Sequence, residues 1–129
     1  MSTYLFAVPI SPGKTDELKG YYREINEQHI AEYKASMQRA GIKSEQRWIQ
    51  HNPNGTDIVV LSWDTDNPRK AFETRLNSQD PFDKWLREKV INGCLCITDT
   101  RRFLPLNELV TDITLQPSSE RVHVQTGKR

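Results

Sequence analysis

The chain has 129 residues, of which 36% are hydrophobic and 27% are charged, and its formal net charge at pH 7 is +1. This composition is typical of one globular domain and excludes a disordered chain. The basic residues are scattered and no apolar stretch is long enough to span a bilayer, so we expect neither nucleic acid nor a membrane as a partner.

The first forty residues predict a strand followed by one long helix. Residues 4–10 form an apolar run that Ser11-Pro12-Gly13 ends, which predicts the first strand. The helix is predicted from Thr15, which caps it, to Ala40, because Gly41 follows directly. Spacings of three and four place one apolar face along this helix, made of Leu18, Tyr22, Ile25, His29, Tyr33, Met37 and Ala40.

The remaining elements are marked by turn and capping residues. Two extended runs, 44–51 and 57–63, flank the turn sequence NPNG and predict a hairpin. Asn67-Pro68 and Asp80-Pro81 each place a capping side chain before a proline, which predicts two further helical segments. Residues 94–107 are expected to form a loop, with 94–97 as a possible short strand. Residues 109–115 are the predicted fourth strand.

The first and third predicted strands are apolar on both faces. Leu5 and Ala7 face away from Tyr4, Phe6 and Val8 on the first strand, and the third strand shows the same pattern. Two helices cover only one face of a sheet. We therefore predict an α+β, ferredoxin-like domain of β-α-β-β-α-β order over residues 1–115, whose other sheet face pairs with a second copy of the chain in a homodimer. The polar tail, 116–129, is predicted to clasp that partner.

Four stretches carry a resemblance to a known superfamily: VPISPGK at 8–14, RAGI at 39–42, SQDPFDKWLREKV at 78–90 and NELVTD at 107–112. In these stretches the chain resembles the dimeric α+β barrel superfamily, and most of all its small, uncharacterised, stress-associated members near the antibiotic biosynthesis monooxygenases. The resemblance implies two sheets that form a barrel across the dimer, with a cavity between sheet and helices in each subunit. An amino-acid-binding regulatory module shares the strand order and stays open as an alternative.

The resemblance also implies a range of activities. Some relatives oxidise aromatic compounds without a cofactor, others isomerise lactones, and others degrade haem. A haem-degrading relative needs an asparagine on the first strand, and residues 4–10 contain none. We therefore expect a cofactor-independent monooxygenase or isomerase that acts on a small aromatic or lipophilic compound. The alternative is a dimer that binds a small molecule or a protein without turnover.

His29 is the candidate catalytic residue, because an imidazole on the apolar face of the long helix suits a general base or a group that orients the substrate. A histidine that is merely paired in the core is the alternative interpretation. Aromatic residues are expected to converge on the cavity and to bind the substrate, although core packing is an alternative role for each of them. The residues expected to bind the substrate are Tyr22, Tyr33, Trp48, Trp63 and Trp85, with Phe72 and Phe82 beside them.

The other reactive residues favour no further site. Cys94 and Cys96 are too few for a metal site and are expected to be free thiols, which together with the absence of a visible secretion signal favours the cytoplasm. Arg47 and His51, at the end of the hairpin, are expected to be solvated. The sequence contains no phosphate-binding loop and no nucleophile elbow, so no cofactor and no metal are expected.

Overall fold

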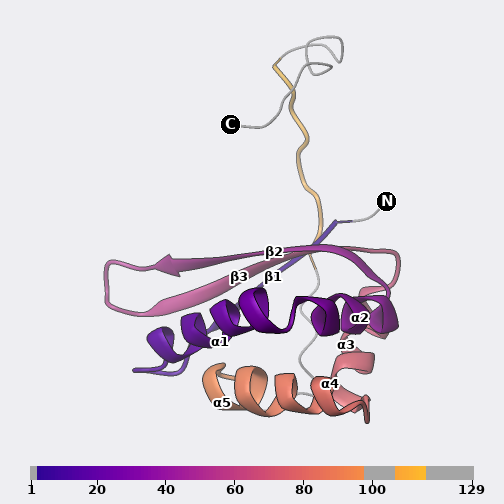
Figure 1. Ribbon diagram of the computed structural model, residues 1–129. Helices are drawn as coiled ribbons and strands as arrows, with labels where there is room; N and C mark the ends of the chain where they lie inside the picture. The colour runs from indigo at the N-terminus through magenta and orange to yellow at the C-terminus, as the bar shows by residue number, and fades with distance from the viewer. Residues whose placement is uncertain (1–2, 98–106, 116–129) are drawn as a thin grey trace.

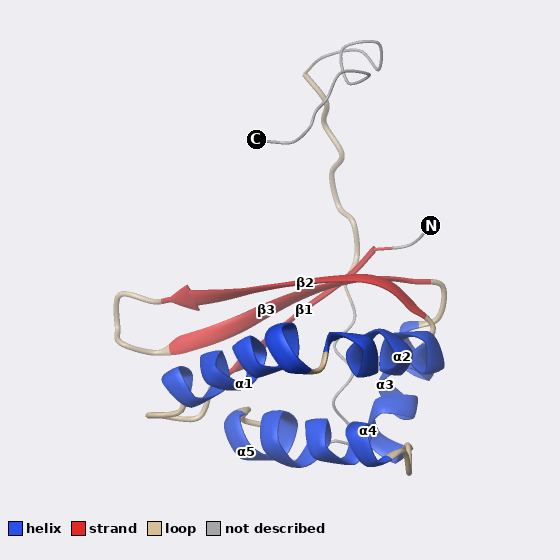
Figure 2. Ribbon diagram, viewed as in Figure 1, coloured by secondary structure: helices blue, strands red, loops and turns tan. Residues whose placement is uncertain are grey.

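The computed structural model describes residues 3–97 and 107–115, and these residues form an α+β fold. Figures 1 and 2 show a three-stranded sheet with the helices gathered on one of its faces. The elements in chain order are β1 (Thr3–Pro9), α1 (Thr15–Gln28), α2 (Ile30–Ala40), β2 (Ile42–His51), β3 (Asp57–Thr65), α3 (Pro68–Asn77), α4 (Pro81–Leu86), the π-helix η1 (Arg87–Ile91) and α5 (Asn92–Cys94).

The sheet is antiparallel and has the order β1-β3-β2. The predicted hairpin is confirmed, because β2 pairs with β3 from Ile42 opposite Thr65 to His51 opposite Asp57. β1 also pairs with β3, from Thr3 opposite Asp64 to Pro9 opposite Ile58. β3 therefore lies in the centre of the sheet, and the half-polar β2 lies at an edge, where one row of backbone groups faces away from the sheet.

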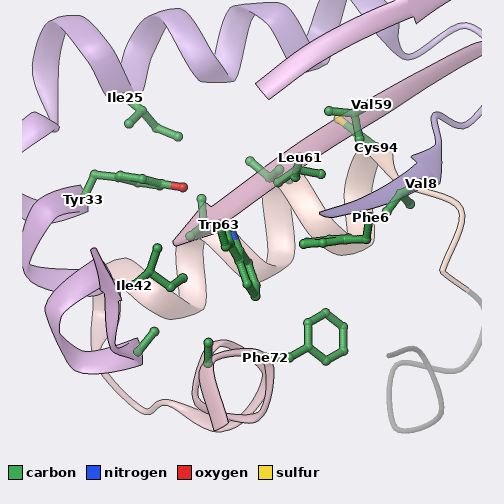
Figure 3. Close-up of a cluster of buried hydrophobic side chains, with 14 of the residues drawn as sticks. Phe6, Val8, Ile25, Tyr33, Ile42, Val59, Leu61, Trp63, Phe72 and Cys94 are labelled. Carbon is green, nitrogen blue, oxygen red and sulfur yellow. The ribbon is translucent and has the colours of Figure 1, made fainter. Parts of the chain in front are cut away.

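The inner face of the sheet carries the hydrophobic core. Tyr4, Phe6 and Val8 of β1 point toward the helices, and so do alternate residues of β3. Figure 3 shows this cluster, in which side chains from both strands meet those of the helices. The helical contribution includes Leu18, Ile25, Tyr33, Phe72, Phe82, Leu86 and Val90, all buried. Burial of this apolar surface is the main force that holds the helices on the sheet.

One predicted helix is two helices. The pattern predicts a continuous helix from Thr15 to Ala40, but the backbone leaves the helical conformation at His29, with φ −133° and ψ 26°. Neither glycine nor proline marks this position, so the sequence carries no ordinary break signal. The break coincides with the two carboxylates, Glu24 and Glu32, that bind the His29 ring from either side. Thr15 is not the predicted cap either, since its hydroxyl donates to Asp57 at 2.6 Å.

The two predicted cap-and-proline signals are confirmed. The Asn67 side chain accepts from the backbone of Lys70 at the start of α3, and the Asp80 carboxylate accepts from the first backbone N–H groups of α4. The helix that begins at Pro81 then widens into the π-helix η1 before α5. The wider turn adds a residue between successive contacts, so Leu86, Val90 and Ile91 can all face the sheet.

The predicted fourth strand is not a strand in the single chain. Residues 107–115 run as an extended segment away from the sheet, on the side opposite the helices (Figure 1). The Asn107 side chain donates to the carbonyl of Leu5 on β1, and the segment then leaves the sheet edge. Its apolar side chains are almost fully exposed, at 79% for Leu109 and Val110, 89% for Ile113 and 91% for Leu115.

The other predictions for the C-terminal part have mixed outcomes. Residues 94–97 do not form a strand, although Leu95 makes an isolated bridge with Ile10. The predicted tail, 116–129, lies outside the described residues. Among the helices that are described, none has the length and apolar character needed to cross a membrane.

Candidate functional site

An apolar cavity lies between the inner face of the sheet and the helices. Its volume is about 60 Å³, smaller than the cavity of about 150 Å³ that accommodates benzene in other proteins. An aromatic ligand therefore needs some of the lining side chains to move outward. We call this space the inner cavity; it is lined by Phe6, Val8, Tyr22, Tyr33, Glu45, Arg47, Leu61, Trp63, Phe72, Arg75, Leu86, Val90, Ile91, Leu95 and Ile97.

The walls of the inner cavity come from elements that are distant in sequence. In Figure 3 the rings of Phe6, Trp63 and Phe72 face a common space, and the Tyr33 hydroxyl points from α2 toward Leu61 and Trp63. The rings of Phe6 and Trp63 meet edge to face, with centroids 4.9 Å apart. Flat apolar walls with a few polar groups at one end are typical of sites for small organic molecules.

Glu45 is the centre of the polar end. Its side chain is 3% exposed, and it is the one carboxylate among the described residues that line the inner cavity. One carboxylate oxygen accepts from the Tyr33 hydroxyl, and the other accepts from the Trp63 indole N–H at 2.8 Å. A buried carboxylate requires such partners, because an unpaired buried charge costs several kcal/mol.

Two guanidinium groups face this single carboxylate. Arg47 Nη1 lies 3.4 Å from Glu45 Oε1, and Arg75 Nη2 lies 4.0 Å from the same oxygen. Burial disfavours the charged form of Arg75, but Tyr33 and Glu45 outweigh burial and raise its pKa. Both arginines are charged at neutral pH. The polar end therefore holds two positive charges and one negative charge.

The phenols near these charges keep their protons. Burial raises the pKa of Tyr22 and of Tyr33, and the nearby guanidiniums offset only part of this shift. Both groups are therefore neutral at pH 7. Tyr33 donates to Glu45 and accepts from Arg47 Nη1 at 2.7 Å, so its hydroxyl links the two charged side chains.

Arg47 also borders a second space, an outer cleft. Its guanidinium carbon lies 4.2 Å from the centre of the Tyr22 ring and 5.2 Å from that of Tyr33, within the range of cation–π attraction. The outer cleft has a volume of about 430 Å³, which is in the usual range for ligand sites. Four residues line both spaces: Tyr22, Tyr33, Glu45 and Arg47. A ligand that enters from the outer cleft therefore meets the polar end first.

The structure brings together only part of the predicted aromatic set. Tyr22, Tyr33 and Trp63 line the inner cavity, and their role in binding stays a prediction. Trp48 lies on the opposite face of the sheet and is 55% exposed, because alternate residues of a strand face opposite sides. Trp85 lies between α1 and α4, where its ring meets those of Tyr21, His29 and Phe82. The expectation that Trp48 and Trp85 converge on the cavity is wrong.

His29 does not line the inner cavity. Its ring nitrogens lie 2.7 Å from a Glu32 oxygen and 3.3 Å from a Glu24 oxygen, and its side chain is 29% exposed. The hydrogen bond with Glu32 raises the pKa of His29, and Glu24 adds to this effect. An imidazole held by two carboxylates at a helix junction has a structural explanation that needs no substrate.

Sequence reasoning missed three charged residues of the site: Glu45, Arg47 and Arg75. Strand alternation from Ile49 would have placed Glu45 and Arg47 on the inner face, opposite Trp63 and Leu61. Helical spacing would have placed Arg75 beside Ala71 and Phe72, both buried. These signals were present, but a charged residue is usually assigned to the surface.

The remaining reactive groups form no second site. Among residues 3–97 and 107–115, no three His, Cys, Asp or Glu side chains come close enough to hold a metal ion. Cys94 and Cys96 are both free, and only Cys94 is buried. Comparison of the sequence with protein-family models and with curated proteins found no match.

Proposed function

We propose that this protein is a homodimer of the dimeric α+β barrel type, and that it is a cofactor-independent monooxygenase or isomerase. In this proposal it acts on a small aromatic or lipophilic compound in the inner cavity. The observation that carries the proposal is an aromatic-walled cavity with a buried carboxylate, Glu45, and a protonated phenol, Tyr33, at one end.

These groups suit a reaction that begins with loss of a proton from carbon. The Glu45 carboxylate takes the proton, and the electron pair of the C–H bond passes into a neighbouring carbonyl or aromatic system. The guanidiniums of Arg47 and Arg75 stabilise the negative charge that develops, because oriented charged donors act strongly in a dry site. Tyr33, which donates to Glu45, holds the base in place. The carbanion then takes back a proton at another position, which is isomerisation, or it forms a C–O bond with dioxygen. In the second case the peroxide takes up the proton held by Glu45 and loses water, so one oxygen atom stays on the substrate as a carbonyl and the other leaves as water. Glu45 replaces His29 as the base, because His29 lies outside this cavity.

A second candidate function is binding without turnover. Each oxygen of Glu45 already accepts a hydrogen bond from a neighbouring side chain, Tyr33 or Trp63. A carboxylate whose two oxygens are both bonded in this way is held in place by its neighbours, which favours a structural role for it. In that case the cavity binds its ligand reversibly, and the ligand raises the melting temperature without being consumed.

Turnover separates the two candidates. With an anthrone-type aromatic substrate, we expect the wild-type protein to consume dioxygen or to form an isomer faster than the uncatalysed reaction. Tyr33→Phe is expected to lower the rate about tenfold or more, because it removes the hydroxyl that donates to Glu45 and so orients the base. His29→Ala is the control and is expected to retain the wild-type rate. Binding without any product, for every substrate tested, would leave reversible binding as the function.

The outer face of the sheet supports the homodimer. Leu5 is 48% exposed and Trp48 is 55% exposed, and Ala7 and Val60 lie side by side between them. The extended segment 107–115 leaves on the same side of the sheet and exposes apolar side chains (Figure 1). A second copy offers a matching apolar face, and we propose that 109–115 becomes the fourth strand of the ferredoxin-like sheet when the two copies pair.

Light scattering on the full chain tests this assembly. We expect a dimer mass for the wild type and a monomer mass for Val60→Asp, because a buried unpaired carboxylate in the interface costs several kcal/mol. Ile113→Asp tests the extended segment separately and is expected to weaken the dimer. Glu27→Lys, on the exposed side of α1, is the control and leaves the mass unchanged. A monomeric wild type would exclude the barrel.

A further inference from the structure

The side chain of Arg75 is buried, but not all of its N–H groups donate a hydrogen bond. The residue is 7% exposed, and it lines the inner cavity. Its Nε and Nη2 atoms have no hydrogen-bond partner among the described residues. These two nitrogens form one edge of the guanidinium, the edge that binds both oxygens of a carboxylate at once. Buried donors without partners are rare, because each one costs free energy.

The same protein shows what this edge binds elsewhere. Arg39 uses its Nε and Nη2 atoms to hold both oxygens of Asp83, at 2.9 Å and 3.0 Å. Within residues 3–97 and 107–115, Arg75 has no equivalent carboxylate. Glu45 approaches only to 4.0 Å, and its oxygens already accept from Tyr33 and Trp63.

The charges at the polar end point to the same ligand. Glu45 balances one of the two guanidiniums, so one positive charge is left in a largely apolar space. An anion on Arg75 balances that charge, whereas a neutral ligand or water does not. The rings of Phe6, Trp63 and Phe72 then contact whatever apolar group carries the anion.

We propose that the ligand of the inner cavity is a small aromatic or aliphatic carboxylate, whose carboxylate binds the Nε and Nη2 edge of Arg75. This inference rests on the proposed function and specifies its substrate class. In this proposal Arg75 selects anionic ligands, and the aromatic side chains of the cavity wall contact the apolar part of the ligand. The ligand enters past Arg47, which borders both the inner cavity and the outer cleft.

Titration calorimetry at pH 7 with matched pairs of compounds tests this assignment. Benzoate and phenylacetate are compared with benzamide and phenylacetamide, which have the same shape and no charge. We expect the carboxylates to bind the wild-type protein about 10–100-fold more tightly, as for a hydrogen-bonded charge pair in a buried site. Arg75→Met is expected to remove this preference. Arg75→Lys keeps the positive charge but lacks the pair of nitrogens that binds both carboxylate oxygens. This variant is expected to retain only part of the preference for carboxylates over amides.

Two further measurements keep the result interpretable. Arg69→Met, exposed on the same helix, is the matched control and is expected to bind as the wild type does. The melting temperature of ligand-free Arg75→Met is expected to equal or exceed that of the wild type, since an unbalanced buried charge has been removed. Lost binding in a variant with an intact melting curve therefore reports on the site rather than on folding.

The outcomes distinguish the two levels of the proposal. Equal binding of carboxylates and amides would overturn the assignment of Arg75 and leave the proposed cavity intact. Failure of all four compounds to bind would overturn both the assignment of Arg75 and the proposed ligand-binding role of the inner cavity. A preference for carboxylates that survives in Arg75→Met would place the anion elsewhere and would also overturn the assignment.

Discussion

Glu45→Gln is expected to lower the free energy of unfolding by about 3–5 kcal/mol, the usual cost of removing one partner from a buried ion pair. Glu45 is the negative charge that faces Arg47 and Arg75, with oxygen–nitrogen distances of 3.4 Å and 4.0 Å. The substitution keeps the shape of the side chain, but it leaves two guanidiniums against an apolar cavity. Unfolding in urea, followed by circular dichroism, measures the change.

A double substitution tests the cause of this loss. If unbalanced charge is the reason, Glu45→Gln combined with Arg75→Met is more stable than Glu45→Gln alone, although a second core residue has been changed. Glu73→Gln, an exposed change of the same chemistry on α3, is the control and is expected to alter stability by less than about 0.5 kcal/mol. Equal stability of the single and double variants would show that Glu45 acts through packing or hydrogen bonding alone.

Asp83 is expected to make the protein sensitive to acid. Its side chain is 2% exposed. Burial by itself raises the pKa of Asp83, but the Arg39 guanidinium and the Ser78 hydroxyl, which both donate to the carboxylate, outweigh burial and lower the pKa from 3.8 to about 2. A lowered pKa in the folded state means that the ionised form stabilises the fold. This stabilisation of about 2 kcal/mol is complete above the unfolded pKa, near pH 4, and is lost as the pH falls to about 2.

The comparison of wild type with Asp83→Asn isolates this contribution. At pH 7 the variant loses the ion pair with Arg39 and is expected to be less stable by about 2–3 kcal/mol. The difference between the two proteins is expected to shrink by about 2 kcal/mol between pH 4 and pH 2, because protonation removes the same charge from the wild type. Asp66→Asn, in an exposed pair with Lys43, is the control. A difference that stays constant over this pH range would contradict the assignment.

The ion pairs of Arg39 with Asp80 and Asp83 join residues that are distant in sequence, although Asp80 itself has a local sequence signal. Asp80 was identified from sequence as the cap of α4, because a capping residue followed by proline is a signal within three positions. Nothing in those positions indicates that Arg39, at the end of α2, binds Asp80 and Asp83 at once. The local element was predictable, and its partner was not.

The same distinction applies to the candidate site. Strand alternation and helical spacing place Glu45, Arg47 and Arg75 on inward faces, yet only packing brings β2 and α3 within 4.0 Å of each other at these side chains. The break at His29 has no glycine or proline signal, and it coincides with the carboxylates of Glu24 and Glu32 that bind its ring. For this reason His29 was predicted as part of the cavity and lies outside it.

The amino-acid sequence alone specifies the elements whose signals are local: the three paired strands, the hairpin turn, and the two helices that begin with a capped proline. It also shows that β1 and β3 carry apolar residues on both faces, because alternation can be read along each strand. The tertiary structure decided which charged side chains share a cavity, and that residues 109–115 do not join the sheet of their own chain. Local signals extend over about four residues, whereas burial and charge balance depend on groups that only the folded chain brings together.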